Sequence, residues 1–292
     1  MNGNKIDLVI PYVDNKDIIW RKKYIEYCQT HNKRIKIADI NTCRYEDIGL
    51  INYHLILANK NYPFINRIFL LVSNKEQVPQ DLPNNVIVVL HEQFIPYKYL
   101  PTFNSTTIEM FLWRIPNLGG YFIYANDDML PCKEMKETDF FVNGKIRINF
   151  KDDPMRFNNR NEFPYQCWNV YCAMAKLFKS EIQDNTKILR PYHTITPMIK
   201  SHCIEIYEKL KNYIMPNIGA FRTIYQYNQY IYPMYELFMG NTEKSDIDFY
   251  YTEIEKEEDF NFNHQVVCIN MIKDESKIAF IRKELEQLCK KQ

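Results

Sequence analysis

Two adjacent carboxylates follow a short apolar run in the middle of the chain. The run over 120–124 predicts a buried strand, and Asn126, Asp127 and Asp128 come directly after it. Ligands of open α/β sheets bind at the carboxyl ends of the strands. Carboxylate oxygens suit Mg²⁺, which is usually held by one or two carboxylates together with substrate phosphates. The triplet is therefore a candidate metal–phosphate site. The alternative is a simple turn, because Asn and Asp are common turn residues.

Polar residues also precede that strand. The segment over 100–105 reads Leu-Pro-Thr-Phe-Asn-Ser and leads into a short helix predicted over 106–113, which Ser105 is expected to cap. The N-terminus of a helix attracts anions, so Asn104 and Ser105 are candidates for hydrogen bonds to a sugar or a phosphate. A plain capping role is the alternative for Ser105. Arg114 follows the helix as a further candidate for binding phosphate.

Together these segments resemble the second conserved region of the Stealth family of sugar-1-phosphate transferases. That family includes bacterial capsular polysaccharide phosphotransferases and the lysosomal-enzyme N-acetylglucosamine-1-phosphotransferase. The resemblance covers nearly the whole chain, strongly in the first half and loosely in the second, and it is most specific over residues 100–128. It is carried by Leu100–Ser105, Glu109, Arg114–Pro116 and Phe122–Asp128, with further matches at Ile6–Asp14, Arg44–Asp47, Ile68–Val72, Pro191–His193, Arg222 and Cys268–Asn270. The chain departs from the family pattern at Tyr12, Asn15 and Met271, where the family has Trp, Gly and often Asp.

The resemblance implies an enzyme that transfers a hexose- or N-acetylhexosamine-1-phosphate from a nucleotide sugar to a glycan hydroxyl. Such a reaction builds phosphodiester-linked capsular or surface polysaccharide and releases a nucleoside monophosphate. The implied cofactor is Mg²⁺ or Mn²⁺, and the implied partners are a nucleotide sugar donor and a glycan acceptor. Two alternatives stay open. One is a metal-dependent glycosyltransferase that releases a nucleoside diphosphate, and the other is a non-catalytic glycan-binding protein, which Met271 favours.

Phosphoryl transfer needs charge neutralisation and a base near the attacking hydroxyl. The resemblance assigns the metal to Asp127 and Asp128, with Asn270 joining through space. It suggests His193 as the base, because an imidazole near its ordinary pKa of about 6.5 accepts a hydroxyl proton. A lone histidine is more often structural. The expected catalytic residues are His193, Asp127, Asp128 and Arg222, and the expected substrate-binding residues are Asp14, Arg44, Asn104, Ser105, Arg114 and Asn126.

Several of these residues have plain structural alternatives. Asp14 at the end of the first strand would face the nucleotide or assist the metal, but a turn-forming role is equally open. Arg44 and Arg114 could instead tie helices to the sheet through carboxylate pairs, and Arg222 could be a surface or capping arginine. Four other histidines have no surrounding constellation and are expected to be structural: His54, His91, His202 and His264. The tyrosines at 225, 227, 230, 232 and 235 are expected to pack a helix rather than to stack on sugars.

Composition narrows the class of protein. The chain has 292 residues and a formal charge of +1, from 37 Lys and Arg against 36 Asp and Glu, which argues against nucleic acid as its main ligand. Its 8 cysteines are scattered without a Cys-x-x-Cys pair, so we expect reduced thiols rather than a structural zinc site. No signal peptide or long apolar span is evident. The expected compartment is the cytoplasm, with peripheral association with a membrane polysaccharide assembly complex as a further prediction.

The elements that must position these residues alternate in type. Strands are predicted at 6–13, 67–73, 85–90, 120–125 and 266–270, and helices at 17–30, 44–60, 106–113 and 277–291. This pattern predicts an α/β, Rossmann-like, mostly parallel sheet flanked by helices. Residues 139–165 are expected to mix short strands and a loop, and 166–240 to be largely helical. We expect a single catalytic domain over 1–292. Its 1–145 half would bind nucleotide sugar and metal, and its 146–292 half would bind acceptor and phosphate and return to the sheet near 266–270.

Overall fold

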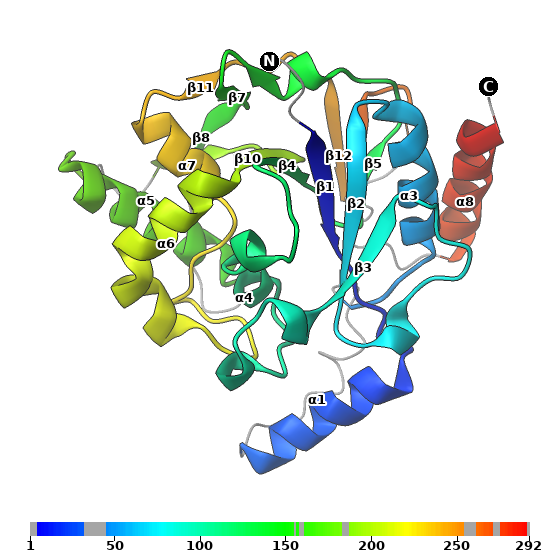
Figure 1. Ribbon diagram of the computed structural model, residues 1–292, viewed down its shortest axis with the longest axis horizontal. Helices are drawn as coiled ribbons and strands as arrows, with labels where there is room; N and C mark the ends of the chain where they lie inside the picture. The colour runs from blue at the N-terminus through cyan, green and yellow to red at the C-terminus, as the bar shows by residue number, and fades with distance from the viewer. Residues whose placement is uncertain are drawn as a thin grey trace. The chain divides into compact units, whose positions relative to one another are not determined.

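A computed structural model describes residues 5–31, 45–154, 156–157, 161–182, 187–253, 261–270 and 275–290. The chain forms two compact units. The first unit comprises 1–5, 92–123 and 138–245, and the second comprises 6–91, 124–137 and 246–292. Figure 1 colours the chain from its N-terminus to its C-terminus. The expectations for Arg44 and Met271 lie outside the described residues.

Three parallel strands, labelled in Figure 1, form the centre of the second unit. They are β1 (Ile6–Pro11), β2 (Ile65–Val72) and β3 (Val86–Leu90), and β2 lies between the other two. Leu8 pairs with Ile68, which in turn pairs with Val86. Near-continuous apolar runs such as these are typical of parallel strands, which are buried on both faces. The strands predicted from the apolar runs are confirmed to within two residues at each described end.

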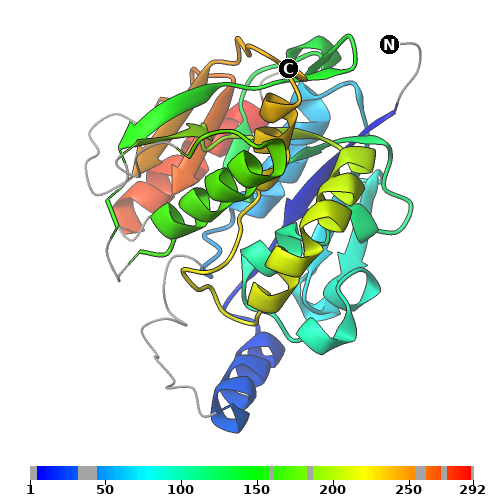
Figure 2. The same ribbon diagram turned by 90° about the vertical axis from the view of Figure 1, so that its left-hand side faces the viewer.

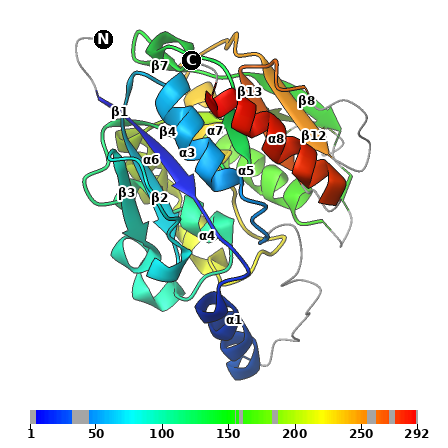
Figure 3. The same ribbon diagram turned by 90° about the vertical axis from the view of Figure 1, so that its right-hand side faces the viewer.

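The residue directly before each of two helices in the second unit determines where that helix begins. In α1 (Ile18–Thr30), Asp17 accepts a hydrogen bond from the Ile19 amide and caps the helix. Helix α3 (Leu50–Asn61) begins later than the predicted 44–60, because Gly49 adopts a φ of +88°, in the left-handed region. Helix α8 (Glu275–Lys290) lies beside α3 (Figure 3) and confirms the predicted terminal helix.

A second sheet in this unit has three strands. It consists of β5 (Met129–Pro131), β12 (Phe249–Glu253) and β13 (Val266–Asn270), with β13 in the middle. The strand predicted at 266–270 is therefore confirmed, and its neighbours are β12 and β5 rather than β1 to β3. Ile281 and Leu285 of α8 are completely buried in the apolar cluster formed with these strands. This packing holds β5, the strand that directly follows the Asp127–Asp128 pair.

The first unit is richer in helices, two of which face the viewer in Figure 2. They are α4 (Ser105–Glu109), α5 (Phe163–Phe178), α6 (Lys200–Ile214) and α7 (Ile231–Phe238), and α7 contacts both α5 and α6. Its strands are β6 (Phe141–Val142), β7 (Lys145–Arg147), β8 (Phe150–Pro154), β9 (Lys187–Pro191), β10 (Thr196–Ile199) and β11 (Thr242–Glu243). Strand β4 (Tyr121–Tyr124) crosses the boundary between the two units in the sequence.

The fold class is confirmed as mixed α/β, with parallel strands, flanking helices and a helical C-terminal part. Two details differ from the expectation. Strands β9 and β10 interrupt the stretch expected to be helical, because their buried apolar residues also fit strands. The helix expected over 106–113 ends at Glu109 and is followed by a separate 3₁₀ turn over Leu112–Arg114. In the described ranges, no helix combines the length and apolar character needed to cross a membrane.

Candidate functional site

Acidic residues of the second unit follow the ends of two neighbouring strands. The Ala125 amide donates a hydrogen bond to the Val9 carbonyl at 3.0 Å, so the chain that leaves β4 runs beside β1. Asp14 comes shortly after β1, and Asn126–Asp128 come directly after β4. The structure therefore brings Asp14 and the Asn-Asp-Asp triplet to the edge where ligands of parallel sheets bind.

Asp127 and Asp128 are half-buried residues with like charges. Burial raises the pKa of the Asp127 carboxyl well above its ordinary value, and the negative charges of Asp128 and Asp47 raise it further. Burial likewise raises the pKa of Asp128 to about 6, and a hydrogen bond from the Cys268 thiol opposes that rise. Two neighbouring carboxylates resist ionising together unless a positive charge compensates them. The pair is therefore electrostatically suited to a cation.

One oxygen of this pair has no protein donor. Asp128 Oδ1 is buried without a hydrogen-bond partner among the described residues. The Ile269 amide donates to the Asp128 carbonyl at 2.9 Å, which places Asn270 at the neighbouring position of β13. Asp127, Asp128 and Asn270 thus offer the hard oxygen ligands that Mg²⁺ or Mn²⁺ accepts. The described part of the chain holds no group of three or more His, Cys, Asp or Glu arranged for a metal.

Tyr12 and Asp47, to which sequence reasoning assigned no role, support this acidic edge. The Tyr12 hydroxyl donates to Asp47 Oδ2 at 2.9 Å, and Asp47 Oδ1 accepts from the amides of Gly49 and Leu50, at the start of α3. Burial raises the pKa of Tyr12 far above its ordinary value, and the charges of Asp47, Asp14 and Asp127 act in the same direction. Burial also raises the pKa of Asp14, whose Oδ1 accepts from the Lys16 amide at 2.9 Å. Tyr12 thus remains a protonated donor among carboxylates.

Two further residues contact Asp127 and Asp128. His54 of α3 is completely buried, and its Nδ1 lies 3.3 Å from the Asp127 carbonyl oxygen. Burial lowers the pKa of His54 to about 4, so the neutral ring can donate from Nδ1 to that carbonyl. Cys268 of β13 is also buried and bonds to Asp128. Neither contact was foreseeable, because each joins elements that are distant in the sequence.

In the first unit, an arginine is held at the start of a short helix. Arg222 Nη2 donates to Ser105 Oγ at 2.6 Å. The prediction that Ser105 caps α4 is wrong, because Asn104 is the cap and accepts from the Thr106 amide at 3.1 Å. Asn104 has the extended backbone that a cap requires, and asparagine is among the best capping residues. Ser105 is therefore released from capping and can orient Arg222.

The loop that carries Arg222 is fixed by Gln226. The amide oxygen of Gln226 accepts from Asn104 Nδ2 at 3.0 Å, from Thr106 Oγ1 at 2.9 Å and from the Thr223 backbone at 3.1 Å. Asn104 is only 1% exposed, and its side chain is bonded on both sides within the protein. The geometry thus favours a structural role for Asn104, which holds the helix start and the Arg222 loop together.

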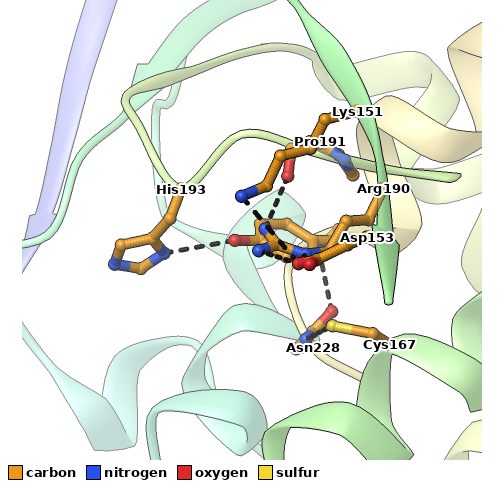
Figure 4. Close-up of polar contacts among 8 residues, drawn as sticks. Lys151, Asp153, Cys167, Arg190, Pro191, His193 and Asn228 are labelled. Atoms are coloured by element: carbon orange, nitrogen blue, oxygen red, sulfur yellow. Dashed lines mark hydrogen bonds and ion pairs between the residues drawn. The ribbon is translucent and has the colours of Figure 1, made fainter. Parts of the chain in front are cut away.

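His193 lies near two arginines of the same unit. Its Nδ1 is 3.2 Å from the hydroxyl of Tyr230, as the dashed line in Figure 4 marks. Burial lowers the pKa of His193 to about 4, and the positive charges of Arg190 and Arg222 lower it further. The expected value near 6.5 is therefore corrected downward. His193 is neutral at physiological pH, as an acceptor of protons must be. Arg190, His193 and Arg222 are called the basic group below.

Among the described residues, the Arg114 side chain contacts Phe94 and Trp113 rather than the residues of the basic group. Its side chain is exposed, and its Nε donates to the Phe94 carbonyl at 2.9 Å. Its guanidinium also lies 5.5 Å from the centre of the Trp113 ring. Arg114 is therefore bonded to a backbone carbonyl. The alternative from the sequence was an ion pair with a carboxylate. A role in phosphate binding stays a prediction for Arg114, as it does for Asn126.

Paired carboxylates at strand ends, with a histidine and arginines elsewhere in the chain, are features of α/β proteins that act on phosphorylated ligands. Residues 44–148 match the family described as Stealth protein CR2, conserved region 2. Relatives named capsular polysaccharide phosphotransferases align over as much as 92% of the chain. Residues 44–148 are thus similar to a conserved region of the Stealth family, and proteins named capsular polysaccharide phosphotransferases align with most of the chain.

Three relatives illustrate the similarity. A capsular polysaccharide phosphotransferase of Actinobacillus suis is 28% identical over 90% of this chain and 63% of its own length. The capsular polysaccharide phosphotransferase eps5J of Streptococcus thermophilus is 36% identical over 49% of this chain and 60% of its own length. The capsular polysaccharide phosphotransferase WcwK of Streptococcus pneumoniae is 27% identical over 92% of this chain and 90% of its own length. The chain thus spans less than two thirds of the first two relatives.

Proposed function

We propose that this chain transfers a hexose- or N-acetylhexosamine-1-phosphate from a nucleotide sugar to a glycan hydroxyl, in the synthesis of capsular or surface polysaccharide. The names of the relatives support a phosphotransferase of capsule synthesis. The observation that carries the proposal is the half-buried Asp127–Asp128 pair, with raised pKa values and with an Asp128 Oδ1 that has no hydrogen-bond partner among the described residues. A cytoplasmic location and association with a membrane assembly complex stay predictions.

The carboxylate pair has the chemistry of a metal site. Asp127 and Asp128, with the amide oxygen of Asn270, would hold Mg²⁺ or Mn²⁺. When bound, such a cation neutralises charge on the phosphoryl oxygens of the donor. Tyr12 and Asp47 keep this edge ordered, because their hydrogen bond ties the segment after β1 to the start of α3.

His193 is suited to the proton transfer. Its neutral imidazole would take the proton of the acceptor hydroxyl on Nε2 as the hydroxyl oxygen forms a bond to the phosphorus that carries the sugar. The bond between that phosphorus and the bridging oxygen of the donor breaks, and the nucleoside monophosphate leaves with the bonding electron pair. Arg222, oriented by Ser105, would stabilise the negative charge on the phosphoryl oxygens.

The direct test is the nucleotide product. Purified protein would be mixed with Mg²⁺ or Mn²⁺, a panel of nucleotide sugars and short capsule-type glycans. Released nucleotides would be identified by mass spectrometry, and new phosphodiesters on the glycan by ³¹P NMR. We expect a nucleoside monophosphate in equal amount to the phosphate gained by the glycan. Release of a nucleoside diphosphate would instead identify a glycosyltransferase and refute the proposed reaction.

Matched variants assign the roles. Asp127→Asn and His193→Gln should each lower turnover at least about a hundredfold, the usual range for a missing metal ligand or general base. The control is His264→Gln, because His264 is bonded to Asp248 in the second unit and has no place in the proposed chemistry. Near-normal turnover of His193→Gln would exclude His193 as the base.

A further inference from the structure

The hydroxyl that faces His193 belongs to a tightly held tyrosine. Tyr230 is 1% exposed and directly precedes α7. Its amide donates to Asn228 Oδ1 at 3.2 Å, and its ring meets that of Phe163 edge to face, with the centroids 5.9 Å apart. The Arg190 guanidinium lies 6.0 Å from the centre of the Tyr230 ring. These contacts leave the hydroxyl little freedom to move away from His193 Nδ1.

The segment that carries His193 is anchored as well. Arg190 Nη1 donates to the Pro191 carbonyl at 3.0 Å, and the same guanidinium forms an ion pair with Asp153 of β8. Figure 4 shows Arg190 and Asp153 close together, and its dashed line from His193 Nδ1 marks the contact with the Tyr230 hydroxyl. The contact between His193 and Tyr230 therefore joins two rigid parts of the same unit.

A neutral imidazole carries its single proton on one of two nitrogens. The hydrogen bond made by one nitrogen decides which of them is protonated. A tyrosine hydroxyl can donate or accept, so the distance alone permits both arrangements. A base that acts through Nε2 needs its lone pair there, which requires the proton on Nδ1. The proposed chemistry and the observed contact agree only if Tyr230 accepts.

We propose that Tyr230 is a positioning residue that accepts a hydrogen bond from Nδ1–H of His193 and so keeps the lone pair on Nε2. This inference rests on the proposed function in one respect, which is that Nε2 takes the proton of the acceptor hydroxyl. When the proton of the acceptor hydroxyl arrives on Nε2, the resulting imidazolium donates more strongly from Nδ1 to the Tyr230 oxygen. Tyr230 would thus support both the resting tautomer and the protonated state.

The tautomer can be measured without turnover. The chain has 6 histidines, so ¹⁵N-labelled histidine gives a tractable two-dimensional NMR spectrum, and His193→Gln identifies the His193 signals by their loss. We expect Nδ1–H in the wild-type protein and a shift toward Nε2–H in Tyr230→Phe. The matched control is Tyr232→Phe, since Tyr232 is also buried and loses a single hydrogen bond, to the Glu109 carbonyl. It should leave the His193 signals unchanged.

Kinetics provide the second readout. Tyr230→Phe should lower kcat about tenfold or more with little change in KM, because the wrong tautomer impairs proton transfer rather than binding. Nε2–H in the wild-type protein, or an unchanged tautomer in Tyr230→Phe, would overturn the inference. If the tautomer shifts as expected but the chain releases no nucleotide from any donor, the positioning contact stands and the proposed function fails.

Discussion

Replacing Asp128 by asparagine should make the protein more stable while it abolishes activity. Asp128 is a half-buried residue whose Oδ1 is buried and whose pKa is raised, so its ionised form is unfavourable in the folded state at neutral pH. Asparagine has nearly the same shape and carries no charge. The substitution also removes the negative charge of Asp128, which raises the pKa of Asp127. The same change would deprive the proposed cation of a ligand.

The size of the effect follows from the pKa. A shift from 3.8 to about 6 in Asp128 corresponds to roughly 3 kcal/mol at most, since one pKa unit is about 1.4 kcal/mol. Because the pKa of Asp128 is higher in the folded state than in the unfolded state, Asp128 does not lower the free energy of unfolding at a pH below its unfolded pKa. The free energy of unfolding then falls as the pH rises through about 6, where the folded-state carboxyl ionises. The gain from Asp128→Asn is therefore complete only above that pH. Loss of the Cys268 hydrogen bond offsets about 1 kcal/mol, which leaves a net gain of about 1–2 kcal/mol.

Thermal unfolding at pH 8 is the assay. In EDTA, the midpoint of Asp128→Asn should exceed that of the wild-type protein by about 2–4 °C. Addition of Mg²⁺ should raise the midpoint of the wild-type protein, because a ligand that binds only the folded state stabilises it. The same addition should shift Asp128→Asn much less. Repeating the measurement at pH 4.5 in EDTA should remove most of the difference between the two proteins.

Asp7→Asn is the matched control for this prediction. Asp7 is completely buried, unlike the half-buried Asp128, and it receives two hydrogen bonds from Arg67, at 3.1 and 2.8 Å. Breaking that pair should cost about 2 kcal/mol or more, so the same substitution has the opposite sign. If Asp128→Asn were less stable than the wild-type protein in EDTA at pH 8, the argument that Asp128 is held at a free-energy cost would be refuted.

Three further predictions concern the remaining chemistry and the core. Arg222→Gln removes a positive charge near His193 and should raise its pKa above about 4, so the acidic limb of the kcat/KM profile should move to higher pH; an unmoved limb would contradict this. Gln226→Leu removes an acceptor shared by three donors and should cost about 2–4 kcal/mol in urea unfolding, whereas an unchanged midpoint would make that network unimportant. Ile281→Ala, at a completely buried position, should cost about 2–5 kcal/mol, and Phe280→Ala, which is 45% exposed on the same helix, less than about 1 kcal/mol; equal losses would refute the assignment of the buried face.

Local sequence patterns predicted much of the fold. The apolar runs of β1, β2 and β3 are long enough to identify buried parallel strands, and α8 shows its inner face by its spacing. Periodicity was less informative for β9 and β10. Short apolar runs fit strands and helices equally well, and only their neighbours decide between them. The start of α3 depended on the backbone of Gly49, which no periodic pattern encodes.

The sequence by itself determined which side chains were available and which of them follow strand ends. Asp14 and the Asp127–Asp128 pair were identified because a parallel strand delivers the residues after it to one edge of the sheet. The local motif also showed Asn104 and Ser105 at a helix start, although it assigned the cap to the wrong one of the two.

Only the tertiary structure decided what each side chain contacts. Cys268 reaches Asp128, and Tyr230 reaches His193, across long stretches of sequence. The pKa of His193 depends on burial and on the charges of two arginines, so its low value could not be predicted from residue type. Burial and electrostatic interactions depend on distances in space, and the folded packing of distant segments sets those distances.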